Sequence, residues 1–318
     1  MTDVSFDVPI LVLAFNRPER LRGLIARLRE VRPASLFLSV DGPRQNSESD
    51  MRLVAEVQQL VAEIDWPCDV RTNFRSENLG CGKAVSTGID WFFHHVESGI
   101  ILEDDVLPNL DFFAFCRELL ARYTDDERVF AISGCNFAPK DHIEQSASYR
   151  FSAITHVWGW ATWRRAWGTY RFDMRDWRKR LPMRQRWNAM GANMGGFIYW
   201  TAVFDWMRFG KIDTWDYQWS LAQMAHGGLT ATSNVNLTDN VGFAEDATHT
   251  SHKPAFIRPS EGMDFPLTHP EVQPDLTADR WVRSQVLQAS TQSAWRMVRD
   301  NVLQRGASVK RSITGGSA

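Results

Sequence analysis

The sequence predicts an α/β fold with a mostly parallel central sheet, and three features of residues 9–133 support this prediction. Short apolar runs of strand length alternate with longer stretches in which apolar residues recur at helical spacing. The first run, Pro9–Phe15, is apolar throughout, as in a strand that helices cover on both faces. Turn-forming or acidic residues follow the runs directly. Strands and helices that alternate in this way form βαβ units, whose strands run parallel.

Each element of this region has its own signal. Pro18 suits the first turn of a helix, and Asp41-Gly42-Pro43 is a turn signal after the second strand. Asn78–Gly82 is a turn before the third helix. The predicted elements, in chain order, are strand Pro9–Phe15, a helix that begins at Pro18, strand Leu36–Val40, a helix over Leu53–Ile64, strand Cys68–Arg71, helix Lys83–His95, strand Ile100–Leu102, helix Phe112–Tyr123 and strand Val129–Ser133.

The pattern changes after Gly134. Residues 149–167 mix aromatic residues, glycine and arginine without a clean period. The elements predicted beyond them are helices Phe197–Phe209 and Tyr217–Ala225, strand Leu229–Val235, the loop Asn240–His252 and a long helical stretch Ala278–Leu303. We therefore divide the chain into residues 1–135, 136–275 and 276–318.

The composition is that of an ordinary globular protein, with 44% hydrophobic and 23% charged residues among 318. A net charge of −2 gives no reason to expect nucleic acid as a partner. The four cysteines show no CxxC spacing, which favours free thiols in a reducing compartment. The N-terminus lacks the basic region of a signal peptide, and no apolar run approaches the ~20 residues that span a bilayer. We therefore expect a cytoplasmic protein.

Three adjacent acids, Glu103, Asp104 and Asp105, follow the apolar run Ile100–Leu102 without a break. Two unit charges about 4 Å apart repel each other by roughly 4 kcal/mol at an effective dielectric of 20. A strand end tolerates such a group when water screens it or when a cation binds it. Carboxylate oxygens suit Mg²⁺ or Mn²⁺.

Asp41, Asn16 and Arg17 also follow predicted strands directly. Ligands of parallel α/β sheets bind outside the carboxyl ends of the strands. Because these polar residues and the three acids converge on such ends, a ligand site is favoured over a solvated acidic turn.

Four stretches together resemble glycosyltransferases of the GT-A fold: PILVLAFNRPERL, LFLSVDG, ENLGCGKAVSTGIDWFF and GIILEDDVLPNLDFF. Their order and spacing are most similar to the alpha-mannoside beta-1,2-N-acetylglucosaminyltransferase I family and to bacterial family-2-type glycosyltransferases. The resemblance covers residues 8–135 and continues more weakly from Trp215-Asp216 to His249. HVWGWATWRRAW and VGFAEDATHT also resemble the bacterial members. The sequence lacks the membrane anchor and stem of the Golgi enzymes, so their protein acceptor is not expected.

The resemblance implies a UDP-sugar donor, with Mn²⁺ or Mg²⁺ as the cofactor. Asp105, the last acid, would contact the metal, which neutralises the diphosphate leaving group. Glu103 and Asp104 would face the ribose, the sugar or metal-bound water.

The resemblance also implies three further donor-binding residues. Arg17 would pair with the diphosphate; its alternative is a surface arginine near a helix start. Asp41 would accept a hydrogen bond from uracil, and its alternative is a turn-forming Asp before Gly-Pro. Lys83 would reach phosphate, with a solvated helix lysine as an equal alternative.

An inverting transferase needs a carboxylate base within hydrogen-bond reach of the attacking hydroxyl. Trp215-Asp216, in IDTWDYQW, resembles the Trp-Asp that carries this base in the family, so the base is assigned to Asp216. Asp205, in FDWMRFG, is the competing candidate, and an Asp at a helix start is the alternative for both. His249, with His252 as the second choice, is the candidate for a further metal or phosphate contact; a surface-loop histidine is its alternative.

Many of the 14 tryptophans lie between Trp158 and Trp219. Aromatic rings stack on sugar faces, but they also fill protein cores, and core packing is the default for most of them.

The expected function is transfer of a sugar from a UDP-sugar, with UDP-GlcNAc as one candidate, to a hydroxyl of a glycan or a lipid-linked saccharide. Transfer would proceed with inversion by direct displacement. Residues 1–135 would bind the donor, and residues 136–275 the acceptor. Residues 276–318 would form a helix and a basic tail, of which Trp295–Arg311 is a candidate for peripheral contact with an anionic membrane.

Two alternatives remain. A nucleotidyltransferase of the same fold is the first, but AFNRPER lacks the glycine-rich loop with a basic residue that such enzymes carry after the first strand. A non-catalytic sugar-binding protein of this fold is the second.

Overall fold

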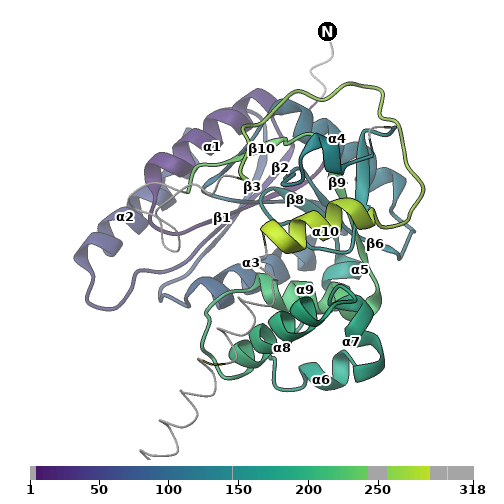
Figure 1. Ribbon diagram of the computed structural model, residues 1–318. Helices are drawn as coiled ribbons and strands as arrows, with labels where there is room; N and C mark the ends of the chain where they lie inside the picture. Colours follow the sequence, from purple (N-terminus) through teal and green to yellow (C-terminus); the bar gives the residue numbers. More distant parts are fainter. Residues whose placement is uncertain (1–4, 145, 243–255, 287–298, 300–318) are drawn as a thin grey trace, which may run out of the picture.

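The computed structural model describes residues 5–144, 146–242, 256–286 and 299 (Figure 1). Its strands are β1 (Ile10–Ala14), β2 (Ser35–Val40), β3 (Asp69–Phe74), β4 (Ser98–Glu103), β5 (Val106–Pro108), β6 (Val129–Ser133), β7 (Tyr149–Ser152), β8 (Trp160–Trp163), β9 (Leu229–Ser233) and β10 (Thr238–Asn240). Its helices are α1 (Pro18–Val31), α2 (Glu48–Gln59), α3 (Cys81–His95), α4 (Leu110–Arg122), α5 (Arg164–Trp167), α6 (Trp177–Arg180), α7 (Met183–Ala189), α8 (Met194–Arg208), α9 (Asp216–His226) and α10 (Leu276–Gln285). Short 3-10 turns lie at Leu60–Glu63 and Lys140–His142.

One sheet of eight strands organises the described chain, in the order β3-β2-β1-β4-β8-β6-β9-β7. β1, β2, β3 and β4 run parallel to one another. β8 is antiparallel to both of its neighbours, β4 and β6, while β9 is parallel to β6. β7 runs antiparallel at the edge, and β5 and β10 form a separate antiparallel ribbon. The sheet is mainly parallel, with helices on both faces, which confirms the predicted α/β fold class.

The two faces of the sheet bury different helices. Ile10 and Val12 of β1 pack in one cluster with apolar residues of α1, α2 and α4. Leu11 and Leu13, which alternate with them, pack in a second cluster with residues of α3, α5 and α9. This arrangement follows from the pleat of a strand, and it explains why the strand sequence is apolar at every position.

Helices α6, α7 and α8 form a helical lobe, residues 171–211, at the lower end of the molecule in Figure 1. The lobe has its own apolar cluster, which includes Met174, Trp177 and Phe204 and reaches Leu221 of α9. Trp160, Trp177 and Trp219 are among the largest fully buried side chains, so these tryptophans fill cores. Helix α9 therefore packs against both the lobe and the sheet.

The structure differs from the prediction mainly in residues 149–167. This region contains β7, β8 and α5, and none of them shows a clean period in the sequence. β8 reads WATW and is buried at every position, so no alternation of polar and apolar residues marks it. β3 begins one residue and ends three residues later than predicted, and β10 covers the first residue of the predicted loop. α10 is described only to Gln285, and most of the predicted helix beyond it lies outside the described residues.

Within the described ranges, no helix is both long and apolar enough to cross a membrane.

Candidate functional site

The three acids lie at the carboxyl end of β4, where the sequence places them. Glu103 is the last residue of β4 and is paired with Leu13 of the parallel strand β1. The Asp104 amide donates to the Leu13 carbonyl over 3.0 Å. The Phe15 amide donates to Asp104 Oδ2 over 3.5 Å. Asp104 and Asp105 therefore lie beside the loop that connects β1 to α1.

Two arginines at the start of α1 face these acids. Arg17 Nη1 lies 3.4 Å from Asp104 Oδ1 and 3.1 Å from Asp105 Oδ2. Arg20 Nη1 lies 3.7 Å from Asp105 Oδ2. The four side chains are largely buried, so water screens their charges only in part. Arg20 was not singled out in the sequence, although its spacing of three residues from Arg17 was a usable signal.

Burial and mutual repulsion raise the pKa values of two acids. Removal from water is the main cause for Glu103, whose pKa rises to about 8, and the charges of Asp105, Asp104 and Asp216 add to the effect. Removal from water and the charge of Asp105 raise the pKa of Asp104 to about 6, while Arg17 acts in the opposite direction. The arginines therefore do not fully compensate the negative charge, and a bound cation would relieve the remainder.

The residues fit a metal ion that is held mostly by its substrate. Among the described residues, no group of three or more His, Cys, Asp and Glu side chains is arranged to hold a metal ion. Mg²⁺ is commonly bound through one or two carboxylates together with water and substrate phosphates. Asp105 can supply one such carboxylate, and Arg17 beside it can pair with a phosphate.

The end of β10 closes against Asp105. The Val241 amide donates to the Asp105 carbonyl over 2.8 Å. A Cβ atom on Gly242 would lie 2.6 Å from Asp105 Oδ2, so only glycine fits there without a shift. The candidate histidines His249 and His252 lie outside the described residues, and the assignment of His249 stays a prediction.

Asp216, the candidate base, is the first residue of α9. Its charge is one of those that raise the pKa of Glu103. The Thr214 hydroxyl donates to Asp216 Oδ1 over 2.5 Å. Asp216 also raises the pKa values of Tyr199 and Tyr217, which are mainly raised by burial, so its surroundings are aromatic as the sequence suggests.

Asp213 is a further site residue that the sequence analysis missed. Its Oδ1 atom accepts a hydrogen bond from the Gly82 amide, at the start of α3, over 3.0 Å. A Cβ atom on Gly82 would lie 2.7 Å from Asp213 Oδ1 and 2.8 Å from the Thr214 carbonyl oxygen, and one on Gly80, at φ +80°, would lie 2.6 Å from Asp213 Oδ2. Two glycines thus allow the segment before Asp216 to approach α3. The contact joins residues 131 positions apart, which no local pattern reveals.

Cys81 lies within this same group of charges. Displacement of water by the surrounding protein raises the pKa of its thiol to about 12, and the charges of Glu103, Asp213 and Asp216 act in the same direction. Its side chain is nevertheless accessible from solvent. The thiol is therefore protonated at neutral pH, which makes it a poor nucleophile.

Asp41 lies at the carboxyl end of β2, and its carboxylate is already engaged. Oδ1 accepts from the amides of Gly42 and Leu79, each over 3.0 Å, and Oδ2 accepts from Asn78 Nδ2 over 2.9 Å. Burial raises its pKa, and backbone hydrogen bonds, including one from Gly80, oppose that rise. These donors match the roughly four acceptor positions of a carboxylate. A uracil N3–H would have to replace one of them.

Two further residues that the sequence singled out, Lys83 and Asp205, lie on helices α3 and α8. Lys83 is exposed in the first turn of α3. Asp205 of α8 is held by Arg178 through two contacts of 2.5 and 2.8 Å, and by Trp177 Nε1 over 3.1 Å. Asp205 therefore acts as an ion-pair partner inside the helical lobe.

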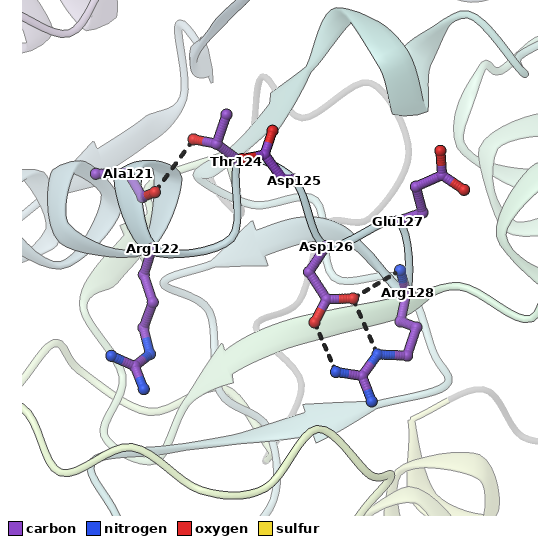
Figure 2. A pocket seen from close by; sticks show the side chains of 7 residues that line it. All are labelled: Ala121, Arg122, Thr124, Asp125, Asp126, Glu127 and Arg128. Atoms are coloured by element: carbon purple, nitrogen blue, oxygen red, sulfur yellow. Dashed lines mark hydrogen bonds and ion pairs between the residues drawn. The ribbon is translucent and has the colours of Figure 1, made fainter.

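A hollow of the surface lies elsewhere, around the turn between α4 and β6 (Figure 2). Its wall includes Arg128, which folds back onto Asp126 over 2.7 Å. The hollow precedes β6, which runs in the same direction as β4. It therefore lies at the amino ends of these strands, whereas the three acids lie at the carboxyl end of β4. Its charged lining residues all come from the segment 122–128, and they are Arg122, Asp125, Asp126, Glu127 and Arg128.

No family model matches the chain, and no curated protein matches it in sequence. Among solved structures, the chain is similar to a mannosyltransferase from Pyrobaculum calidifontis in complex with GDP-Man and Mn²⁺, at 15% identity and a TM-score of 0.35, covering 70% of this chain and 72% of that one. It is also similar to mouse xyloside xylosyltransferase 1, at 11% identity and a TM-score of 0.36, covering 71% and 84%. A third is HddC from Yersinia pseudotuberculosis, at 11% identity and a TM-score of 0.31, covering 50% and 77%. Similarities of this size carry no conclusion about the reaction.

Proposed function

We propose that this chain is a metal-dependent glycosyltransferase that moves a sugar from a UDP-sugar to a hydroxyl of a glycan or lipid-linked saccharide. One observation carries the proposal. At the end of β4, Asp104 and Asp105 pair with Arg17 from the β1–α1 loop, and the charge of Asp216 from α9 acts on Glu103. A carboxylate for a metal, a cation for a diphosphate and a carboxylate for an acceptor are the groups that this reaction needs.

On the donor side, Asp105 would hold Mn²⁺ or Mg²⁺, and Arg17 would pair with the diphosphate. The metal, when bound, supplies positive charge that stabilises the leaving diphosphate. Glu103 and Asp104 would face the ribose, the sugar or metal-bound water. Asp41 would contact the uracil base and Lys83 a phosphate, with His249 as a further contact to metal or phosphate.

On the acceptor side, Asp216 would take the proton of the attacking hydroxyl. Thr214 donates a hydrogen bond to Oδ1 of Asp216, which fixes the orientation of the carboxylate. Displacement from the face opposite to the diphosphate would invert the configuration at the sugar carbon. Residues 1–135 would form the donor half and residues 136–275 the acceptor half.

The ion pairs of Arg17 favour glycosyl transfer over nucleotidyl transfer. A nucleotidyltransferase needs basic groups that surround the attacked phosphate, in a flexible loop after the first strand. Here the basic residue in the loop after β1 is Arg17, and it forms ion pairs with Asp104 and Asp105. In the proposed reaction, its guanidinium would meet a phosphate that arrives together with a metal on Asp105.

The test is release of UDP from a panel of UDP-sugars, measured with Mn²⁺ and with EDTA. We expect slow, Mn²⁺-dependent release of UDP from at least one donor, because glycosyltransferases hydrolyse their donors when no acceptor is present. Asp216→Asn is the matched variant, and it should bind UDP as the wild type does. A nucleotidyltransferase would instead form UDP-sugar from UTP and a sugar phosphate, and a sugar-binding protein would release no UDP.

A further inference from the structure

The helical lobe, residues 171–211, carries a charge unlike that of the rest of the chain. It contains nine basic and three acidic residues, whereas the whole chain has a net charge of −2. The three acids are paired within the lobe: Asp173 with Arg175, Asp176 with Arg180, and Asp205 with Arg178. Of the two acids that follow the lobe, Asp213 accepts a hydrogen bond from the Gly82 amide and Asp216 one from the Thr214 hydroxyl. The surface of the lobe is therefore positive.

Large apolar side chains are exposed on the same lobe. Met183 is 63% exposed, Trp187 44% and Met194 57%. Met183 and Trp187 are four residues apart on α7 and so share one face of it. The Trp187 ring centroid lies 6.3 Å from that of Phe197, which is three residues after Met194 on α8. These four residues form one surface, the Met183 patch.

We propose that the Met183 patch and the basic residues around it dock the protein onto an anionic membrane surface. Tryptophan and methionine insert at the boundary between headgroups and acyl chains, and lysine and arginine attract anionic lipid. Arg184 is exposed on α7 beside Met183, and Lys179 is exposed on α6. Exposed apolar and exposed basic side chains thus occur on the same lobe, as an anionic interface requires.

Charge decides against a second copy of the chain as the occupant. A two-fold symmetric interface brings the same patch of both copies together. It would place two lobes, each with an excess of six positive charges, against one another. A surface rich in anionic lipid offers the opposite charge, and it has no shape that the patch must match.

The position of the lobe fits an acceptor at a membrane. Tyr217 and Leu221 of α9 pack with the apolar core of the lobe, and α9 begins at Asp216. Docking through the Met183 patch would hold the acceptor side of the molecule near the lipid. The binding itself does not depend on the proposed reaction, so it is tested without any activity.

The experiment is flotation of the full chain with vesicles. We expect binding to phosphatidylcholine vesicles that contain phosphatidylglycerol, weaker binding at high salt, and little binding to phosphatidylcholine alone. Met183→Ser with Trp187→Ser should reduce the vesicle partition coefficient about tenfold or more. Lys179→Gln with Arg184→Gln should reduce it about 25-fold, because each basic residue near such a surface contributes about a fivefold factor.

The matched control is Met51→Ser with Leu276→Ser. Both residues are also exposed and apolar, but they lie on α2 and α10, outside the lobe. This variant should bind vesicles as the wild type does. All three variants change exposed side chains, so unchanged melting temperatures will show that they are folded.

Three results would overturn the proposal. The first is no binding of the wild type to anionic vesicles, and the second is binding of both lobe variants that equals binding of the wild type. The third is self-association that the Met183→Ser, Trp187→Ser variant abolishes. The last result would make the patch an interface between copies of this chain. Binding lost only on deletion of residues 304–318 would assign the contact to the basic C-terminus instead.

Discussion

The carboxyl ends of β2 and β4 flank β1 at the same edge of the sheet, but their acids are in different states. Asp41, after β2, accepts hydrogen bonds from two neighbouring amides and from Asn78. At the end of β4, Asp104 and Asp105 pair with Arg17 and Arg20 at the start of α1, and their charges act on the neighbouring Glu103. The same position in the topology thus gives one acid that the protein satisfies and three that it satisfies only in part.

The difference teaches what makes an acid at a strand end a ligand site. A carboxylate whose acceptor positions are already filled by protein donors has few positions left for a ligand. Its main effect is to fix the neighbouring loop. Consecutive acids cannot all be satisfied from within, because they repel one another over a few ångströms. Burial raises the pKa of Asp41 as well, but for Glu103 the charges of the neighbouring acids add to the effect of burial and raise its pKa to about 8.

The variant Asp105→Ala tests most directly whether the acids at the end of β4, unlike Asp41, bind a metal. The account predicts that Mn²⁺-dependent binding of UDP is lost, since Asp105 is the carboxylate proposed to hold the metal. The fold should remain intact, because the side chain lies at a turn after β4. Calorimetric titration of UDP in the presence of Mn²⁺ measures the effect, with circular dichroism as the check on folding. Wild-type affinity in this variant would remove Asp105 from the metal site.

Asp216→Asn should have the next largest effect, on transfer alone. The amide keeps the shape of the carboxylate but cannot take a proton. A general base contributes about 10²–10⁴-fold, or about 3–5 kcal/mol, and kcat should fall by that factor while affinity for UDP is unchanged. The acidic limb of the pH–rate profile should also disappear.

The control for this variant is Asp205→Asn. Asp205 pairs with Arg178 inside the helical lobe, so its change should lower stability and leave kcat near wild type. If Asp205→Asn loses transfer while Asp216→Asn retains it, the assignment of the base is wrong. If both variants stay active, a route without a protein base becomes the better hypothesis.

The site could be predicted from the sequence where its residues are neighbours in the chain. Arg17 and Glu103–Asp105 follow apolar strands directly, and parallel strands place their carboxyl ends together. For the same reason, the order and type of β1 to β4 and α1 to α4 were predicted, but some bounds were wrong. The predicted helix Leu53–Ile64 begins and ends five residues after α2, and the predictions cover three of the six residues in each of β3 and β4. The apolar period and the turn residues of this half are both local signals.

The rest depends on contacts that only the folded chain makes. The hydrogen bond between Asp213 and Gly82 joins distant segments, and nothing around either residue announces it. β8 is a four-residue strand buried at every position, inserted antiparallel between β4 and β6, and it offers no period to detect. The saturation of Asp41 is likewise invisible in the sequence, because Asn78 and Leu79 reach it from another loop.

Asp41→Ala should have a smaller effect than the loss of Asp105 or Asp216. A lost hydrogen bond to a charged group costs about 1.5–3 kcal/mol, so UDP affinity should fall roughly tenfold to a hundredfold if Asp41 contacts the base. The free energy of unfolding should also fall, because several donors lose their acceptor. Asn78→Ala is the matched control, since it removes one donor and leaves the carboxylate. UDP affinity unchanged in a folded Asp41→Ala protein would limit Asp41 to holding the loop.

Asp213→Ala should have the smallest effect, through the position of Asp216. Without its hydrogen bond to Gly82, the segment before α9 is less firmly held against α3. We expect kcat to fall about tenfold with UDP affinity unchanged. Asp213→Asn should restore most of the activity, because its amide oxygen can accept the same bond. Equal losses in both variants would show that the charge of Asp213, rather than its position, matters.

The central claim is that the incompletely satisfied acids at the end of β4 form a site for a divalent cation and a nucleotide diphosphate. Calorimetric titration of the wild-type chain with UDP, once with Mn²⁺ and once with EDTA, tests it most directly. The account predicts clear binding with Mn²⁺ and at least a tenfold loss of affinity in EDTA, about 1.4 kcal/mol. UDP binding of equal strength in both buffers, or none in either, would contradict the account.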